Sequence, residues 1–238
     1  MERDLINNWI NEKGISDLKI IDQLYEFSIL LYNENKKFNL TGCSSLAEII
    51  EKLIIQSLDP LIGINVPRGT SFIDMGSGAG IPGIPLAILF KELHGICLEA
   101  NAKKVSFIEN SIEKLGIDNL KPVCARAEDA GRETVFREKF SWIFTRAMAD
   151  IFISLELGAC FLKKGGLMYI YSNEKINGAD DGIIRHAGNL GLELNPPEKI
   201  TEYNIVSGLL FKKIGQTDNI YPRRFSVLKR MSRKIKKN

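Results

Sequence analysis

The sequence predicts an α/β protein with a doubly wound, mostly parallel sheet and a helical addition at its N-terminus. Short apolar segments with strand character recur between residues 70 and 214, and the first of them alternate with segments whose apolar residues have helical spacing. A glycine-rich loop follows the first apolar segment, as expected where a parallel strand turns into a helix beside a ligand. The 238 residues, 45% of them hydrophobic, suffice for one such core.

Residues 1–65 are predicted to form a helical cap on the sheet. One helix face is indicated by the spacing of Ile20, Leu24, Phe27 and Leu31. Residues 46–58 are predicted to form a second apolar helix. We expect the ligand-binding core to span residues 66–220 and a basic tail to follow over residues 221–238.

The first predicted strand, residues 70–73, runs directly into the loop Asp-Met-Gly-Ser-Gly-Ala-Gly at residues 74–80. Glycine alone accepts positive φ freely and has no Cβ to keep a ligand away from the backbone. We therefore expect this loop to bind a nucleoside ligand. A structural turn without a ligand is the less favoured interpretation.

Two cofactors compete for the loop. Read from Gly78, it satisfies the G-x-G-x-x-G dinucleotide pattern, and Glu99 lies about 20 residues further on. However, Pro82 and Pro85 stand where a phosphate-binding helix would offer free N–H groups. The register D-x-G-x-G-x-G from Asp74 is similar to the first motif of class I S-adenosylmethionine (AdoMet) methyltransferases. AdoMet is favoured over a nicotinamide dinucleotide.

Two acids after the next strands fit a nucleoside. Residues 94–99 are predicted to form the second strand, and Glu99 at its end can accept hydrogen bonds from both ribose hydroxyls. A helix over residues 102–115 and a third strand over residues 120–124 follow. Glu128 follows that strand, at the position where class I methyltransferases contact the adenine amino group; the alternative is an acid favoured by a helix N-terminus.

The fourth predicted strand, residues 140–145, ends before Arg146 and lacks the N/D-P-P-aromatic motif of enzymes that methylate exocyclic amino groups. The Asn-Pro-Pro-Glu segment at residues 195–198 lies too late in the chain and is predicted to be a turn. The four cysteines form no catalytic motif, and neither histidine lies beside the loop. A nucleophile that needs no deprotonation, such as guanine N7, is the acceptor that remains.

Six segments in order resemble a known family. They are FNLTG (38–42), FIDMGSGAGIPGIPLAI (72–88), EANAKKVSFI (99–108), ARAED (125–129), TRA (145–147) and YPRR (221–224). Over nearly its whole length the chain is similar to the bacterial small-subunit ribosomal RNA guanine-N7 methyltransferases. The resemblance implies the class I, Rossmann-like fold with seven strands, the last antiparallel; residues 167–172, 192–200 and 204–214 would supply the late strands.

The resemblance also implies AdoMet as methyl donor and a guanine in a decoding-region loop of 16S rRNA as acceptor. Arg146 becomes the catalytic candidate, and no metal is expected. The expected cofactor contacts are Asp74, Gly76, Ser77, Gly78, Gly80, Ile81, Glu99, Ala100, Asn101, Ala127, Glu128 and Arg146.

Three family motifs are replaced in this chain. Residues 52–57 (Lys-Leu-Ile-Ile-Gln-Ser) stand in place of R-H-x-x-D-S, and residues 171–173 (Tyr-Ser-Asn) in place of L-K-G. The late E-R-H motif is lost around Ser207. An AdoMet-binding or ribosome-associated protein with an altered RNA target or reduced activity is therefore the second functional hypothesis.

Charge is distributed unevenly. Residues 221–238 contain eight basic residues and no acid, whereas the chain as a whole has 32 basic and 29 acidic side chains. Such a run suits RNA phosphates; a solvated tail or a membrane-surface helix is the alternative. Deletion of residues 223–238 is expected to weaken RNA binding and spare AdoMet binding. The expected RNA contacts are Lys103, Lys104, Arg223, Arg224, Lys229 and Arg230.

Other features favour a cytoplasmic enzyme, and we expect it to be a monomer. No apolar run approaches the ~18 residues of a membrane span. The first residues do not have the pattern of a signal peptide. Four cysteines without a pairing pattern suit a reducing compartment.

Overall fold

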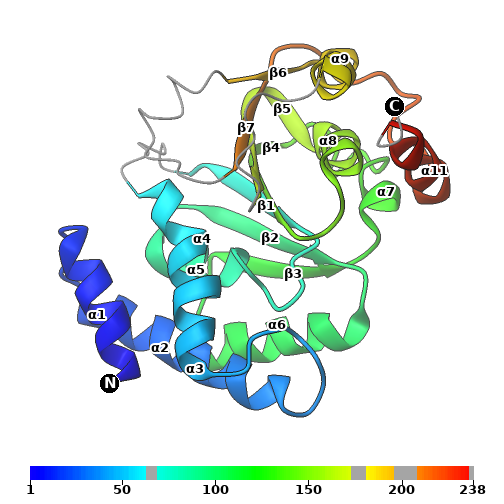
Figure 1. Ribbon diagram of the computed structural model, residues 1–238. Coiled ribbons are helices and arrows are strands. Elements are labelled where there is room, and N and C mark those ends of the chain that lie inside the picture. Colours follow the sequence, from blue (N-terminus) through cyan, green and yellow to red (C-terminus); the bar gives the residue numbers. More distant parts are fainter. Residues whose placement is uncertain (63–68, 173–180, 196–207, 236–238) are drawn as a thin grey trace.

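The computed structural model describes residues 1–62, 69–172, 181–195 and 208–235. A seven-stranded sheet in the order β3-β2-β1-β4-β5-β7-β6 forms its centre (Figure 1). The strands are β1 Ser71–Met75, β2 His94–Glu99, β3 Leu120–Cys124, β4 Phe140–Arg146, β5 Leu162–Tyr171, β6 Leu192–Leu194 and β7 Leu209–Lys213. Strands β1 to β5 pair in parallel, and β7 is antiparallel to both β5 and β6. The predicted fold class, with its antiparallel last strand, is confirmed.

The strand order reverses between β1 and β4, which are neighbours in the sheet. In doubly wound sheets, ligands bind at such a switch point, outside the carboxyl ends of the strands. The chain segments that leave β1, β2, β3 and β4 all start at this edge, so the topology gathers the predicted site residues from four separate stretches of sequence.

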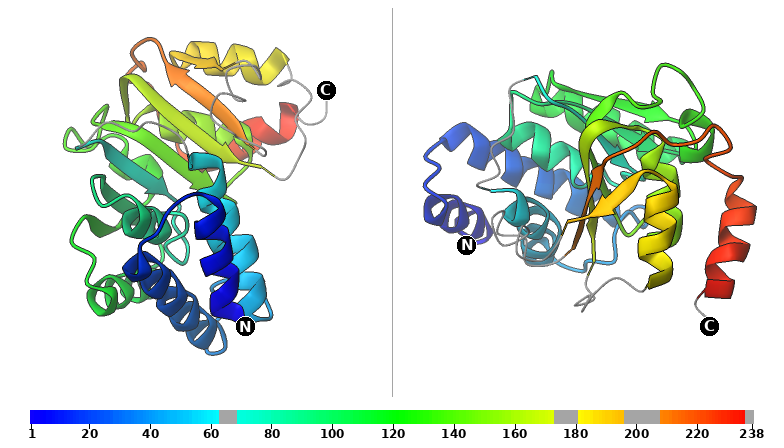
Figure 2. Two further views of the ribbon diagram at one scale, coloured as in Figure 1. Left: turned by 90° about the vertical axis from the view of Figure 1, so that its left-hand side faces the viewer. Right: turned by 90° about the horizontal axis from the view of Figure 1, so that it is seen from above.

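Side chains of each strand alternate between two apolar layers. Phe72, Trp142 and Tyr169 pack on one face of the sheet with the N-terminal helices, α5 Gly83–Leu89 and α6 Ala102–Leu115. Their neighbours Ile73, Ile143 and Met168 pack on the other face, against α8 Ile151–Ala159. Helices α7 Ala127–Ala130, α9 Asp181–Asn189 and α11 Phe225–Ile235 lie on that second side (Figures 1 and 2).

The N-terminal helices share one continuous core with the first face of the sheet. Helix α1 spans Glu2–Glu12, and α2, Leu18–Asn35, begins at Asp17, whose carboxylate accepts the N–H groups of Lys19 and Ile20. The apolar positions of α2 are buried as expected, among them Leu24 and Phe27. The cap therefore packs on the sheet, while the boundary between cap and core near residue 65 stays a prediction.

The predicted helix over residues 46–58 differs from a regular α-helix. It consists of α3 Leu46–Glu48, the π-helix η1 Ile49–Ile55 and α4 Gln56–Leu58, followed by the 3₁₀ turn η2 Asp59–Leu61. A π segment widens the turn and changes which carbonyl groups are free, and such segments are common near functional sites. Apolar periodicity does not reveal it, because the buried residues still fall on one side.

The late strands differ from their predicted bounds. β5 begins at Leu162, five residues before the predicted strand, because an irregularity in its pairing with β4 lets the strand continue past Gly165 and Gly166. β6 ends at Leu194 and β7 begins at Leu209. The intervening parts of the two predicted strands, and the Asn-Pro-Pro-Glu segment beyond Asn195, lie outside the described residues.

The basic C-terminal segment is a packed element and not a separable tail. Helix α11 lies against α8 (Figure 2), and Leu228 on its inner face is fully buried. Arg223 donates to the carboxylate of Glu156 on α8, whose side chain has no exposed surface. Sequence reasoning could not foresee this contact, because an arginine in a basic run has no local signal for a buried partner. Within the described part of the chain, no helix could cross a membrane.

Candidate active site

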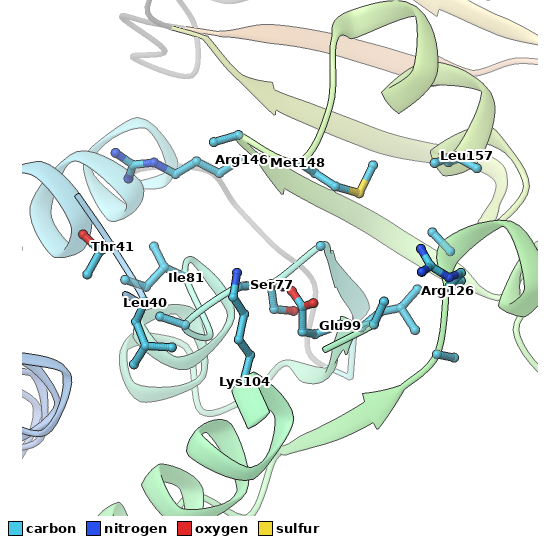
Figure 3. Close-up of a pocket in the computed structure, with 18 of the residues that line it drawn as sticks. Leu40, Thr41, Ser77, Ile81, Glu99, Lys104, Arg126, Arg146, Met148 and Leu157 are labelled. Carbon is cyan, nitrogen blue, oxygen red and sulfur yellow. Dashed lines mark hydrogen bonds between the residues drawn. The ribbon is translucent and has the colours of Figure 1, made fainter. Parts of the chain in front are cut away.

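A cavity of about 510 Å³ opens at the carboxyl edge of the sheet, at the switch point between β1 and β4. This volume is in the range of small-molecule sites. Its wall comes from the loop after α2, η1, the glycine-rich loop, the ends of β2, β3 and β4, and helices α6, α7, α8 and α11. Figure 3 shows the labelled residues of this wall from Leu40 to Leu157. The lining includes ten of the predicted site residues: Gly76, Ser77, Gly78, Ile81, Glu99, Ala100, Lys104, Ala127, Glu128 and Arg146.

Each of the three alternating glycines is required for its own structural reason. All have positive φ: +74° at Gly76, +58° at Gly78 and +81° at Gly80. A Cβ at Gly76 would lie 2.3 Å from Cγ of Met148, and one at Gly80 would lie 2.7 Å from Cδ1 of Ile84. A Cβ at Gly78 would meet no described atom nearer than 4.0 Å, so it would project into open space at the cavity. Of the three, Gly78 is the one that leaves room for a ligand.

Asp74 lies beneath the loop and does not line the cavity. Its side chain is fully buried; Oδ2 accepts the N–H of Gly83 at 2.8 Å, and Oδ1 has no hydrogen-bond partner among the described residues. Burial raises the pKa of Asp74 to about 7, with the negative charge of Glu99 adding to the shift. The predicted direct contact of Asp74 with the cofactor therefore has no support in the geometry: Asp74 joins the loop to the start of α5.

Glu99 is held in place by two backbone N–H groups. Its Oε2 accepts from Gly78 at 2.9 Å, and its Oε1 accepts from Asn101 at 2.8 Å. A carboxylate has about four acceptor positions, so each oxygen keeps a lone pair for another donor. Glu99 points into the cavity beside Ser77 (Figure 3). This geometry suits a pair of ribose hydroxyls.

The hydrogen bonds at the start of α5 argue against a dinucleotide. The N–H of Gly83 donates to Asp74, and that of Ile84 donates to the Gly80 carbonyl at 2.7 Å. The first N–H groups of α5 are therefore already bonded, whereas a pyrophosphate needs free ones. A cofactor without a pyrophosphate, such as AdoMet, fits this loop.

Glu128 and Ala127 line the cavity from the first turn of α7. Arg126, Leu157 and Phe225 complete this end, which combines apolar and polar groups as small-molecule sites do. Sequence reasoning missed these three residues. Arg126 stands next to the predicted Ala127, but Leu157 and Phe225 carry no local signal because they come from α8 and α11.

Arg146 ends β4 and points toward the N-terminal helices (Figure 3). Its guanidinium donates to the carbonyl of Lys52 at 2.5 Å and to that of Leu53 at 3.4 Å, in the π-helix, and lies 5.8 Å from the ring centroid of Tyr171. Burial lowers the pKa of Arg146 from its ordinary value. The Tyr171 hydroxyl donates to the carbonyl of Ser57. Arg146 thus joins the sheet to the helical cap at the cavity wall. Its partners in the cap belong to residues 52–57, the segment that replaces the family's R-H-x-x-D-S motif.

Four predicted residues of the core do not line the cavity. Besides Asp74 and Gly80, Asn101 acts as the N-cap of α6, where its side chain accepts the N–H groups of Lys103 and Lys104. Lys103 lines a different hollow, between α2 and α6, whereas Lys104 points into the cavity (Figure 3). The loop residues Leu40, Thr41 and Gly42, part of the quoted FNLTG motif but not predicted as contacts, do line it.

The predicted RNA contacts of the C-terminal segment are separated by the fold. Arg223 is engaged by Glu156, as described above, and its remaining donor lies against Met231. Arg224, Lys229 and Arg230 form no ion pair within the described residues. Their role in RNA binding stays a prediction.

This fold, with its glycine loop and the acids at the ends of β2 and β3, defines a class I AdoMet-dependent methyltransferase. Likeness to solved structures supports the fold alone. The structure of M. jannaschii TYW2 in complex with AdoMet has a TM-score of 0.50 at 18% identity, over 68% of this chain and 76% of that one. The [4+2]-cyclase SpnF also has a TM-score of 0.50 at 11% identity, over 74% of this chain and 85% of that one.

The chain belongs to the rRNA small subunit methyltransferase G family, whose family model matches residues 20–181. A protein named Ribosomal RNA small subunit methyltransferase G from Carboxydothermus hydrogenoformans is 32% identical over 226 residues, which cover 92% of this chain and 94% of that protein. The protein of the same name from Deinococcus deserti is 31% identical over 223 residues, covering 91% of this chain and 90% of that protein. The predicted family and AdoMet as cofactor are confirmed, and the nicotinamide alternative is wrong.

Proposed function

We propose that this protein transfers a methyl group from AdoMet to N7 of a guanine in 16S rRNA. The observation that carries the proposal is the composition of the cavity, whose lining, among the described residues, contains no histidine and no cysteine. Glu99 is engaged by two backbone N–H groups, and Asp74 is sealed beneath the loop. Guanine N7 attacks through a lone pair and needs no base, so a site that only positions the reactants is sufficient.

The residues around the cavity have distinct tasks in this reaction. AdoMet, when bound, supplies a methyl group activated by its sulfonium. Glu99 would hold the ribose, Glu128 would face the adenine, and Gly78 leaves room for the cofactor beside the loop. As the N7–carbon bond forms, the carbon–sulfur bond breaks and its electron pair stays on sulfur, so no proton has to move in this step.

Arg146 is proposed to support turnover from the wall of the cavity. Its backbone partners at Lys52 and Leu53 hold the guanidinium at the mouth, where one further donor could pair with a phosphate or with the cofactor carboxylate. Lysine cannot reproduce this planar fork. We propose that the protein works as a monomer in the cytoplasm, where its rRNA substrate lies.

The test is to map N7-methylguanine in small-subunit rRNA from cells with and without the gene, and then to methylate the unmodified RNA with purified protein and AdoMet. We expect one guanine to lose its modification in the absence of the gene and to regain it in vitro. Substitution of 7-deazaguanine at that position should abolish methyl transfer. Continued transfer to the 7-deaza substrate would show that N7 is not the acceptor.

A second candidate function follows from the contacts of Arg146. Because its guanidinium is already bonded to the backbone of the segment that replaces R-H-x-x-D-S, the chain could be an AdoMet-binding protein with an altered RNA target or reduced activity. AdoMet binding without methylation of either free 16S rRNA or the assembled small subunit would favour this function.

A further inference from the structure

A second hollow, of about 550 Å³, lies between α2 and α6 on the outside of the helical layer. From α6 it is lined by the exposed residues Lys103, Ser106, Asn110 and Lys114, with the buried Phe107 and Ser111 between them. Their spacing of three or four residues places them along one side of the helix. The other wall is the end of α2 and the turn after it, and we call the hollow the α2–α6 groove.

Two chain segments contribute residues both to the groove and to the active-site cavity. On one wall, Phe38 lines the groove and Leu40 lines the cavity. On the other wall, the consecutive residues Lys103 and Lys104 line the groove and the cavity respectively. A polymer that places one unit in the cavity could therefore continue along α6 without leaving the surface.

The groove is basic. Lys37, Lys103 and Lys114 line it together with a single acid among the described residues, Glu34, which pairs with Lys37 at 2.8 Å. Neither Lys103 nor Lys114 forms an ion pair within the described part of the chain, and the nearby acids of α6, Glu109 and Glu113, do not line the groove. Two uncompensated cations with a hydroxyl and an amide between them form a row of donors for an anionic chain.

The length of this row also suits a nucleic acid. Lys103 and Lys114 are eleven residues apart on α6, which is about 16 Å along the helix. This distance covers several nucleotides of a single strand. Lysine, serine and asparagine side chains are common donors to phosphate and sugar oxygens, and they hold RNA without reading its sequence.

We propose that the α2–α6 groove binds the sugar–phosphate backbone of the rRNA segment that flanks the target guanine. This inference rests on the proposed function for the identity of the RNA. It assigns a task to Lys103, which does not reach the cofactor cavity, and adds Lys114, Ser106 and Asn110 as contacts. The groove would determine affinity and register, while the cavity selects the base.

The test compares the double variant K103A/K114A with the control K163A/K164A. The control removes the same charge from exposed positions near the start of β5, which line neither the groove nor the cavity. Binding of a labelled 16S rRNA fragment is measured by fluorescence anisotropy from low to moderate salt, and AdoMet binding by calorimetry. For K103A/K114A we expect roughly tenfold weaker RNA binding and a salt slope shallower by about 1.4. AdoMet affinity should stay unchanged in both proteins.

Methylation kinetics separate this inference from the proposed function. K103A/K114A should raise KM for the long fragment with little change in kcat. Equal RNA affinity and equal salt slopes for the two double variants would overturn the groove proposal, whether or not the protein methylates the RNA. Absence of methylation by the wild-type protein, with the binding difference intact, would overturn only the N7 function. If polyglutamate displaces the labelled RNA as effectively as unlabelled RNA does, the groove is instead a site for acidic peptides.

Discussion

Replacement of Asp74 by asparagine tests the buried carboxyl group beneath the glycine loop. The pKa of Asp74 is raised from 3.8 to about 7, first because the side chain is completely buried and second because Glu99 is nearby. The folded protein therefore keeps the proton through a pH range in which the unfolded chain has lost it. The stabilisation linked to this proton is fully present below pH 3.8 and is lost as the pH rises through 7.

The magnitude follows from the difference between these two pKa values. About three pKa units at 1.36 kcal/mol each correspond to roughly 4 kcal/mol against the folded state once the carboxyl group is ionised. An asparagine amide at this position would carry no such penalty, and its oxygen could still accept the N–H of Gly83. The free energy of unfolding of Asp74→Asn, minus that of the wild type, should increase by roughly 2–3 kcal/mol between pH 5 and pH 8.

Urea unfolding of the cofactor-free protein at pH 5, 6, 7 and 8 measures this difference. Glu113→Gln, which neutralises an exposed acid on α6, is the control and should change stability by less than about 0.5 kcal/mol at every pH. A constant difference between Asp74→Asn and the wild type from pH 5 to pH 8 would refute the assignment of a raised pKa to Asp74.

Three further predictions concern Gly78, Arg146 and Arg223. Gly78→Val should still fold, at a cost of about 1–2 kcal/mol because valine is strained at a φ of +58°. It should lose AdoMet binding in calorimetry, because its side chain projects into open cavity space; unchanged affinity would remove the loop from the cofactor site. Arg146→Ala should lose most of kcat on rRNA and Arg146→Lys should restore little of it, whereas turnover near that of the wild type would make Arg146 a structural residue only. Arg223→Ala should lower the free energy of unfolding by about 3 kcal/mol, because the Glu156 carboxylate is left buried without its cation. Recovery of stability on adding Glu156→Gln would confirm the cause. An unchanged urea midpoint for the single variant would contradict it.

The docked C-terminal helix changes what a truncation can show. Deletion of residues 223–238 would remove Phe225 from the cavity wall and uncover the apolar surface beneath Leu228. AdoMet binding would then change together with RNA binding, contrary to the expectation from the charge pattern. Substitution of Lys229 and Arg230, which form no ion pair within the described residues, is the cleaner test of RNA binding by α11.

Local sequence determined the parts of the protein that depend on neighbouring residues. The strands β1 to β4 and α6 follow from apolar periodicity, and Asn101 and Gly116 delimit α6 through its N-cap and its left-handed C-cap. The glycine loop follows from positive φ, which the sequence marks by glycine itself. The motifs in their order were sufficient to identify the family and the cofactor, because the residues that line the cofactor cavity come largely from short segments at strand ends.

Only the tertiary structure decided which way the functional side chains point. Arg146 and its partners at Lys52 and Leu53 are more than 90 residues apart, and Arg223 and Glu156 are 67 apart. Sequence spacing within a helix or strand says nothing about such pairs, since they depend on how layers pack. The same reason separates Lys103 from Lys104: one turn of helix presents adjacent residues to different surfaces, and the position of α2 decides what each surface is.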